Sequence, residues 1–122
     1  MRELTNHIVP GDSANHQIRV TVMDEPGSGG ANHHYMIDTE KSESAFASLF
    51  FQNGPIKEAG VNGVTHEALL AVLIDRLYGF QSGPFACEDN AEALRCLKQA
   101  MHCLQRRTEA RIARGVEGTH QQ

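Results

Sequence analysis

The sequence predicts an α+β protein in which a small antiparallel β-sheet in residues 1–55 precedes an antiparallel two-helix hairpin in residues 64–120. Three observations predict this order. They are a strand-like alternation near residue 20, an apolar stripe with helical spacing after Thr65, and a longer helical stripe that ends before Gly115. A chain of 122 residues has an ordinary size for one domain. We therefore expect both parts to form a single domain over residues 1–122.

The clearest strand pattern lies in residues 17–23, where Ile18, Val20 and Val22 alternate with mostly polar residues. This period of two is typical of a half-buried strand. A glycine-rich turn separates it from residues 33–38, which we expect to form the returning strand. Two further segments complete the predicted sheet. Residues 4–9 would form an edge strand, and residues 45–52 fit either a helix or a buried strand, of which we favour the strand.

Two helices are predicted after the sheet. The first runs from residue 66 to residue 80, with Thr65 as its N-cap. The second runs from residue 84 to residue 114, because Pro84 suits a first helical position and Gly115 a C-terminal stop. The apolar seam of the second helix consists of Leu94, Leu97, Met101 and Leu104. The connection between the helices is short, which indicates an antiparallel hairpin.

The predicted helices differ in length, at about 22 Å and about 46 Å. The second helix therefore extends past the first from about residue 101, and this extension still carries Met101, Leu104 and Ile112. Either the β part or another copy of the chain must cover these apolar side chains. Because two isolated helices form a poor core, we expect a homo-oligomer.

Composition and motifs exclude several classes of function. The formal net charge of −4 argues against a general binder of polymeric nucleic acid. No apolar run approaches the roughly 18 residues of a membrane span, and the N-terminus lacks the pattern of a signal peptide, so we expect a cytoplasmic protein. No nucleophile elbow, phosphate-binding loop, dinucleotide motif or metal-ligand spacing is present. The sequence thus predicts no catalytic residues, no cofactor and no metal.

Three arginines of the second helix form the most informative cluster. Arg107, Arg111 and Arg114 fall within about 60° of one another around the helix axis. Guanidinium groups suit phosphate oxygens, because their planar forks donate two parallel hydrogen bonds. A solvated basic helix end, favoured by the helix dipole, explains the same pattern. The spacing alone leaves both interpretations open.

Asn90 and Phe80 are the other candidates. Asn90 falls on the seam side, where its amide needs partners. A base edge or a ribose would supply them, and so would a register-setting contact or a local cap. Phe80 would stack on a base or close the hairpin core. Asn90 and Arg107 lie about 25 Å apart along one helix. One small ligand can therefore contact both only where two antiparallel chains meet.

Linked motifs follow one another through the second half of the chain. They are Phe51-Gln52-Asn53-Gly54-Pro55-Ile56-Lys57-Glu58, Gly60-Val61-Asn62-Gly63, Phe80-Gln81, Phe85-x-Cys87-x-x-Asn90-Ala91 and Arg107-Thr108-x-x-Arg111-x-x-Arg114-Gly115-Val116-x-Gly118-Thr119. Together they resemble the phage anti-Thoeris sponge family (Thoeris anti-defence one). That family shares its helical hairpin with the phage anti-CBASS cyclic-nucleotide sponges. The resemblance covers about residues 50–120.

The resemblance implies a non-enzymatic sponge in the host bacterial cytoplasm. It would sequester the glycocyclic ADP-ribose signal of bacterial Thoeris defence without cleaving it. By the matching motifs, the cyclic ADP-ribose pocket between chains would consist of Phe80, Asn90, Arg107 and Arg111. A separate site for CBASS cyclic oligonucleotides would include Arg114, Gly115 and Thr119.

The resemblance also implies a homo-oligomer, either a dimer or a hexamer built as a trimer of dimers. Two other functions stay open at this point. One is a phage structural protein that oligomerises through the hairpin and binds no nucleotide. The other is an enzyme that degrades the signal.

Overall fold

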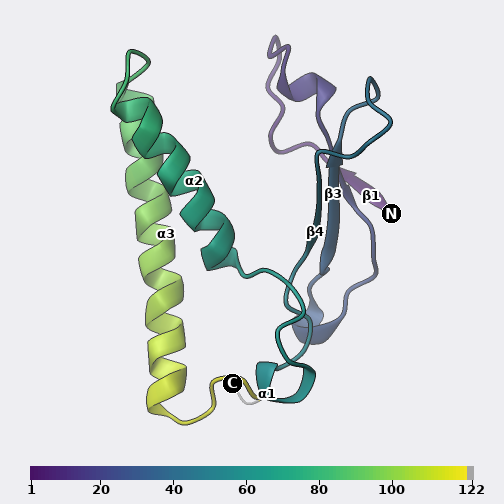
Figure 1. Cartoon of the computed structure of the whole chain (residues 1–122), viewed down its shortest axis with the longest axis vertical. Coiled ribbons are helices and arrows are strands. Elements are labelled where there is room, and N and C mark those ends of the chain that lie inside the picture. The colour runs from purple at the N-terminus through teal and green to yellow at the C-terminus, as the bar shows by residue number, and fades with distance from the viewer. Residues whose placement is uncertain (121–122) are drawn as a thin grey trace. The chain divides into compact units, whose positions relative to one another are not determined.

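The computed structural model describes residues 1–120 and confirms the α+β class. The chain forms two compact units. The first contains Met1–Gly54 and Ala59–Gly63, and the second contains Pro55–Glu58 and the chain from Val64 onward. Figure 1 labels strands of the first unit and the helices of the second.

The first unit is a four-stranded antiparallel sheet. Its strands are β1 (Arg2–Leu4), β2 (Arg19–Val22), β3 (His34–Asp38) and β4 (Ala47–Phe50), hydrogen-bonded in that order. The strands predicted in residues 17–23, 33–38 and 45–52 are confirmed. The edge strand predicted in residues 4–9 is wrong, because β1 ends at Leu4. Beyond it the backbone closes turns, in which the N–H of Ile8 donates to the carbonyl of Thr5 at 3.0 Å.

The register of the sheet separates an apolar face from a polar one. On the apolar face Val22 pairs with Tyr35, and the side chain of Val22 is 1% exposed. On the other face Arg19 forms an ion pair with Asp38 at 2.9 Å. A shift of one residue would exchange the two faces, so burial of the apolar face fixes the register.

Helix α2 (His66–Gln81) begins as predicted, since the hydroxyl of Thr65 accepts a hydrogen bond from the N–H of Ala68 at 3.1 Å. Helix α3 (Glu88–Ala113) begins later than predicted. The side-chain amide of Gln81 binds both the N–H and the carbonyl of Cys87 at 3.1 Å, which holds residues 82–87 in a turn. Pro84 therefore lies in the turn and not at a first helical position.

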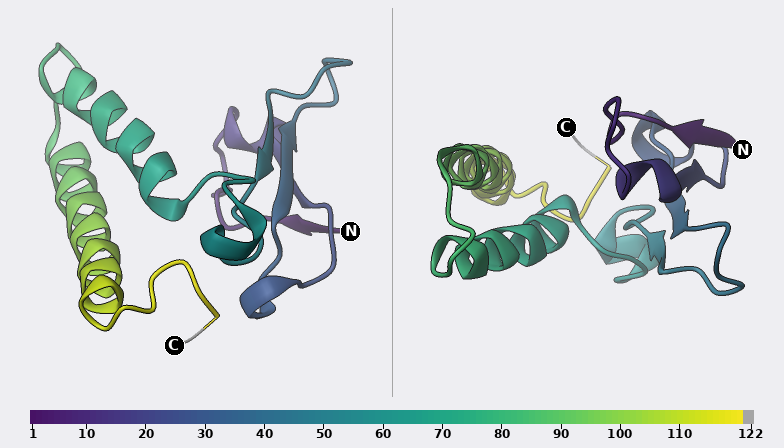
Figure 2. Two further views of the ribbon diagram at one scale, coloured as in Figure 1. Left: turned by 60° about the horizontal axis from the view of Figure 1, so that its bottom comes forward. Right: turned by 90° about the horizontal axis from the view of Figure 1, so that it is seen from above.

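The helices of the second unit lie side by side and antiparallel. They are closest near the connecting turn and diverge toward the start of α2 (Figures 1 and 2). Leu94 is buried at 8% exposure, and the other three seam residues of α3 are half-buried. The stop predicted at Gly115 is confirmed by its φ of +73°. The short helix α1 (Ile56–Ala59) was not predicted, because four residues are too few to show a helical period.

Helix α3 has 26 residues and α2 has 16, so α3 extends about 15 Å farther along its axis. Several large apolar side chains of the second unit remain exposed, among them Val72 at 63% and Ile112 at 60%. The homo-oligomer predicted from this extension stays a prediction. Within residues 1–120, no helix is long and apolar enough to cross a membrane.

Candidate nucleotide-binding site

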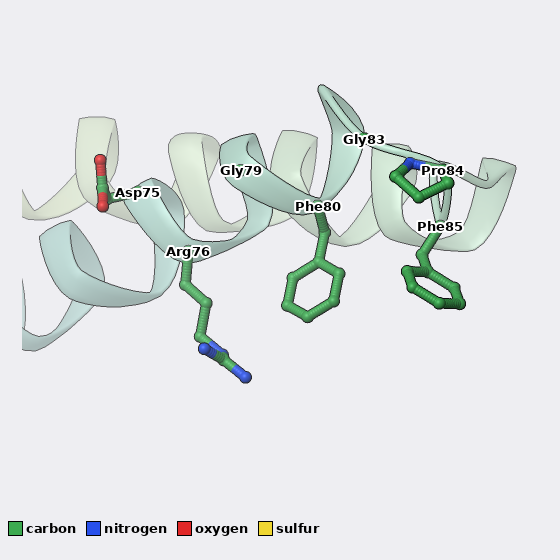
Figure 3. Close-up of a pocket in the computed structure, with 7 residues that line it drawn as sticks. All are labelled: Asp75, Arg76, Gly79, Phe80, Gly83, Pro84 and Phe85. Atoms are coloured by element: carbon green, nitrogen blue, oxygen red, sulfur yellow. The ribbon is translucent and has the colours of Figure 1, made fainter.

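A hollow of about 390 Å³ lies beside the turn that joins α2 and α3; we call it the tip groove. It is lined by Asp75, Arg76, Gly79, Phe80, Gly83, Pro84 and Phe85. Figure 3 shows the side chains of Arg76, Phe80 and Phe85 leaving the hairpin on the same side, with Phe80 between the other two. Gly79 and Gly83 contribute no side chain, and this keeps the groove open.

Phe80 lies in this groove with its side chain 37% exposed, so it does not simply close the hairpin core. The guanidinium carbon of Arg76 lies 5.1 Å from the centroid of its ring, which is a cation–π contact. Residues four apart are neighbours on a helix surface, and this spacing brings the pair together. Sequence reasoning missed Arg76, although its spacing from Phe80 was a signal for this contact.

Asn90 lies in the first turn of α3 and is half-buried. The local capping role belongs to Cys87, whose sulfur accepts a hydrogen bond from the backbone N–H of Asn90 at 3.4 Å. Within residues 1–120, the side-chain amide of Asn90 makes no hydrogen bond. A half-buried amide without a partner is suited to a ligand that brings a donor or an acceptor.

Arg107 and Arg111 lie one turn apart but have different surroundings. The side chain of Arg107 is exposed and makes no hydrogen bond or ion pair within the described residues. The side chain of Arg111 is only 12% exposed. Its Nε donates to the carboxylate of Glu117 at 3.0 Å, and its Nη2 donates to the carbonyls of Val116 and Thr119 at 3.0 and 3.1 Å.

We call Arg111, Val116, Glu117 and Thr119 the tail clasp. The clasp forms because Gly115 turns the chain back past the end of α3. The sequence did not indicate Glu117, the carboxylate that holds Arg111.

The clasp also positions the residues predicted for cyclic oligonucleotides. Thr119 contributes its carbonyl to Arg111, and its hydroxyl donates to the carbonyl of Val116. Gly115 supplies the left-handed backbone conformation, and the exposed Arg114 caps α3. The structure thus brings Arg111, Gly115 and Thr119 into one tail turn next to Arg114.

The tip groove and the tail clasp lie at opposite ends of α3. Asn90 and Arg107 are 17 residues apart on this helix, which corresponds to about 25 Å. One chain therefore does not bring the aromatic and arginine residues of the predicted pocket together.

Among the described residues, no group of three or more side chains that could hold a metal ion is present.

The family model of the Acb2/Tad1 hairpin domain matches residues 49–109, which is half of the chain. The chain belongs to the Acb2/Tad1 hairpin-domain family. The matched range contains Phe80, Asn90 and Arg107, so three of the four predicted pocket residues lie in the shared hairpin. Arg111 and the rest of the tail clasp lie beyond it.

A relative from Bacillus phage SBSphiJ7, described as Thoeris anti-defense 1, is 48% identical to this chain over 75 residues. The match covers 62% of this chain and 53% of that protein. The chain thus spans about half the length of the relative. Both comparisons agree with the resemblance noted from the linked motifs.

Proposed function

We propose that this protein is a phage immune-evasion sponge that binds and sequesters glycocyclic ADP-ribose, the signal of bacterial Thoeris defence, without cleaving it. The observation that carries this proposal is the family match across the hairpin, which includes Phe80, Asn90 and Arg107. The relative described as Thoeris anti-defense 1 supports the same function. The site of action would be the cytoplasm of the infected host.

The proposed pocket is shared between two copies of the chain. One copy contributes Phe80 and Asn90 near the tip groove, and the second contributes Arg107 and Arg111. Antiparallel contact of two α3 helices would bring these ends together. Two chains are needed because Asn90 and Arg107 lie about 25 Å apart along one helix. Exposed apolar side chains such as Ile112 support an association of this kind.

The two arginines would bind the diphosphate in different ways. Arg107 is exposed and can turn toward a ligand without breaking a contact within residues 1–120. Arg111 is oriented by Glu117, and contact with a phosphate would compete with that carboxylate. Charge-assisted hydrogen bonds of this kind contribute about 1.5–3 kcal/mol each.

A second site on the tail turn would bind CBASS cyclic oligonucleotides. It would include Arg114, Gly115 and Thr119, and it would be completed in a hexamer built from three dimers. The support is the arrangement of the tail, where a cationic side chain lies next to a tight backbone turn. This site and the ADP-ribose pocket would use different residues.

A thermal-shift panel of ADP-ribose isomers and cyclic oligonucleotides tests the proposal, followed by chromatography of the ligand released on denaturation. We expect glycocyclic ADP-ribose to raise the melting temperature and to be recovered intact. Recovery of a cleaved ligand would indicate an enzyme. No shift with any nucleotide would indicate a structural protein that oligomerises through the hairpin.

A further inference from the structure

Two residues of the tip groove have no role in the pocket proposed above. Phe85 is 73% exposed, so its ring does not contribute to the hairpin core. Arg76 is exposed as well and lies over Phe80. A hollow lined by two aromatic rings and a guanidinium has the composition of a nucleotide site, in which rings stack on the base and the cation binds phosphate.

The arrangement of the three side chains determines where a base can enter. Arg76 occupies one face of the Phe80 ring, at 5.1 Å from the centroid. Figure 3 shows Phe85 on the side of Phe80 away from Arg76. A base inserted between Arg76 and Phe80 would break the cation–π contact. A base placed between the two rings would keep it, and both rings line the hollow.

Arg76 can bind an anion while it keeps its contact with Phe80. The N–H donors of a guanidinium lie in its own plane, and those that point away from the ring can reach phosphate oxygens. Asp75, the acidic residue of the groove lining, points away from the three side chains in Figure 3. The side of the groove that carries the rings is therefore cationic.

We propose that the tip groove binds a purine nucleotide, with the base between Phe80 and Phe85 and a phosphate on Arg76. This inference rests on the proposed function in one respect. We take the nucleotide to be the adenosine diphosphate half of glycocyclic ADP-ribose. It adds Arg76 and Phe85 to the residues that contact the ligand.

A tryptophan reporter tests the position of the base. The chain contains no Trp, so Phe85→Trp introduces a single emitting side chain into the groove. We expect saturable quenching of its emission by glycocyclic ADP-ribose and, separately, by linear ADP-ribose, because the base would stack on the indole. The matched control is Phe46→Trp in the sheet unit, where Phe46 is 63% exposed and no quenching is expected.

Calorimetric titration of two variants tests the contacts. Arg76→Gln is expected to raise the Kd for glycocyclic ADP-ribose about tenfold or more, because a charge-assisted contact is lost. Phe85→Leu is expected to raise it about fivefold or more, because a stacking surface is lost. Lys98→Gln is the matched control. It removes the cation of a second cation–π contact, 4.3 Å from the Tyr78 ring and outside the groove, and should leave the Kd unchanged.

The outcomes separate this inference from the proposed function. If the unmodified protein binds glycocyclic ADP-ribose but both variants bind equally well and Trp at position 85 is not quenched, the inference is overturned and the proposed function stands. If linear ADP-ribose quenches the reporter while the glycocyclic isomer does not bind, the inference stands and the proposed function is overturned. Binding of neither probe overturns both.

Discussion

The two ends of α3 present their candidate binding residues in different ways. At its N-terminal end the tip groove is open, with Phe85 exposed and the amide of Asn90 without a partner in the described chain. At its C-terminal end Arg111 is held by the tail clasp, whereas Arg107, one turn earlier, is exposed. Two arginines on the same helix face therefore need not share one role. The side chain of Arg107 has no partner among the described residues, whereas Arg111 holds the tail.

The largest effect is expected from removing both arginines. The double variant Arg107→Ala, Arg111→Ala should lower the affinity for glycocyclic ADP-ribose at least a hundredfold in calorimetric titration, because two contacts of about 1.5–3 kcal/mol each are lost. Arg106→Ala is the matched control, since Arg106 is adjacent but projects about 100° away around the helix. An unchanged affinity in the double variant would contradict the site assignment.

The next largest effects are expected from truncating apolar residues at the two ends of α3. One truncation should lower the free energy of unfolding, and the other should weaken self-association. Leu94 is 8% exposed, so Leu94→Ala should lower the free energy of unfolding by about 2–4 kcal/mol in chemical denaturation. Ile112 is 60% exposed within one chain. Ile112→Ala should therefore have little effect on a monomer but should weaken self-association in analytical ultracentrifugation. A monomeric unmodified protein at micromolar concentration would argue against the shared pocket.

The single arginine variants separate a role in the tail clasp from a role in ligand binding. Arg111→Ala should lower the free energy of unfolding by about 1–3 kcal/mol, because Glu117 and two carbonyls lose their donor. Arg107→Ala should change it by less than about 0.5 kcal/mol, because Arg107 makes no such contact. Denaturation of both variants without ligand measures this difference. Equal stabilities would show that the clasp does not stabilise the chain.

The smallest effect is expected from an exposed ion pair near the N-terminal end of α3. Arg95 donates hydrogen bonds to the carboxylate of Glu92, which lowers the pKa of Glu92 below its usual value. The resulting stabilisation is present above the ordinary glutamate pKa of about 4.3 and is lost as the pH falls through the lower folded-state pKa. Exposed pairs contribute little, so Glu92→Gln should leave the melting temperature at pH 7 unchanged. A marked decrease in the melting temperature would mean that this exposed pair stabilises the chain, as the tail clasp is expected to do.

Regular patterns in the sequence predicted most of the fold. The alternation around Val20 predicted β2, and Thr65 and Gly115 marked the start of α2 and the end of α3. The start of α3 could not be read in the same way. It depends on the side chain of Gln81 binding the backbone of Cys87 six residues later, which no periodicity indicates.

The candidate site was predicted only in part for a similar reason. Phe80, Asn90 and Arg107 could be named from residue type, helix position and linked motifs. The partners of Arg111 could not, because they come together only when the tail folds back. Arg76 was missed although it lies four residues before Phe80, and Phe85 was named only as part of a motif. Neither position shows in the sequence that the turn places both side chains around one hollow.

A subunit-mixing experiment tests whether two chains complete each pocket. Phe80→Ala and Arg107→Ala proteins are each expected to bind glycocyclic ADP-ribose poorly. After the two are mixed and allowed to exchange subunits, each mixed dimer would contain one pocket with both changes and one pocket with neither. Tight binding should then return at about a quarter of all pockets, because half of the dimers are mixed at equal proportions. No recovery of binding after demonstrated exchange would contradict the shared pocket.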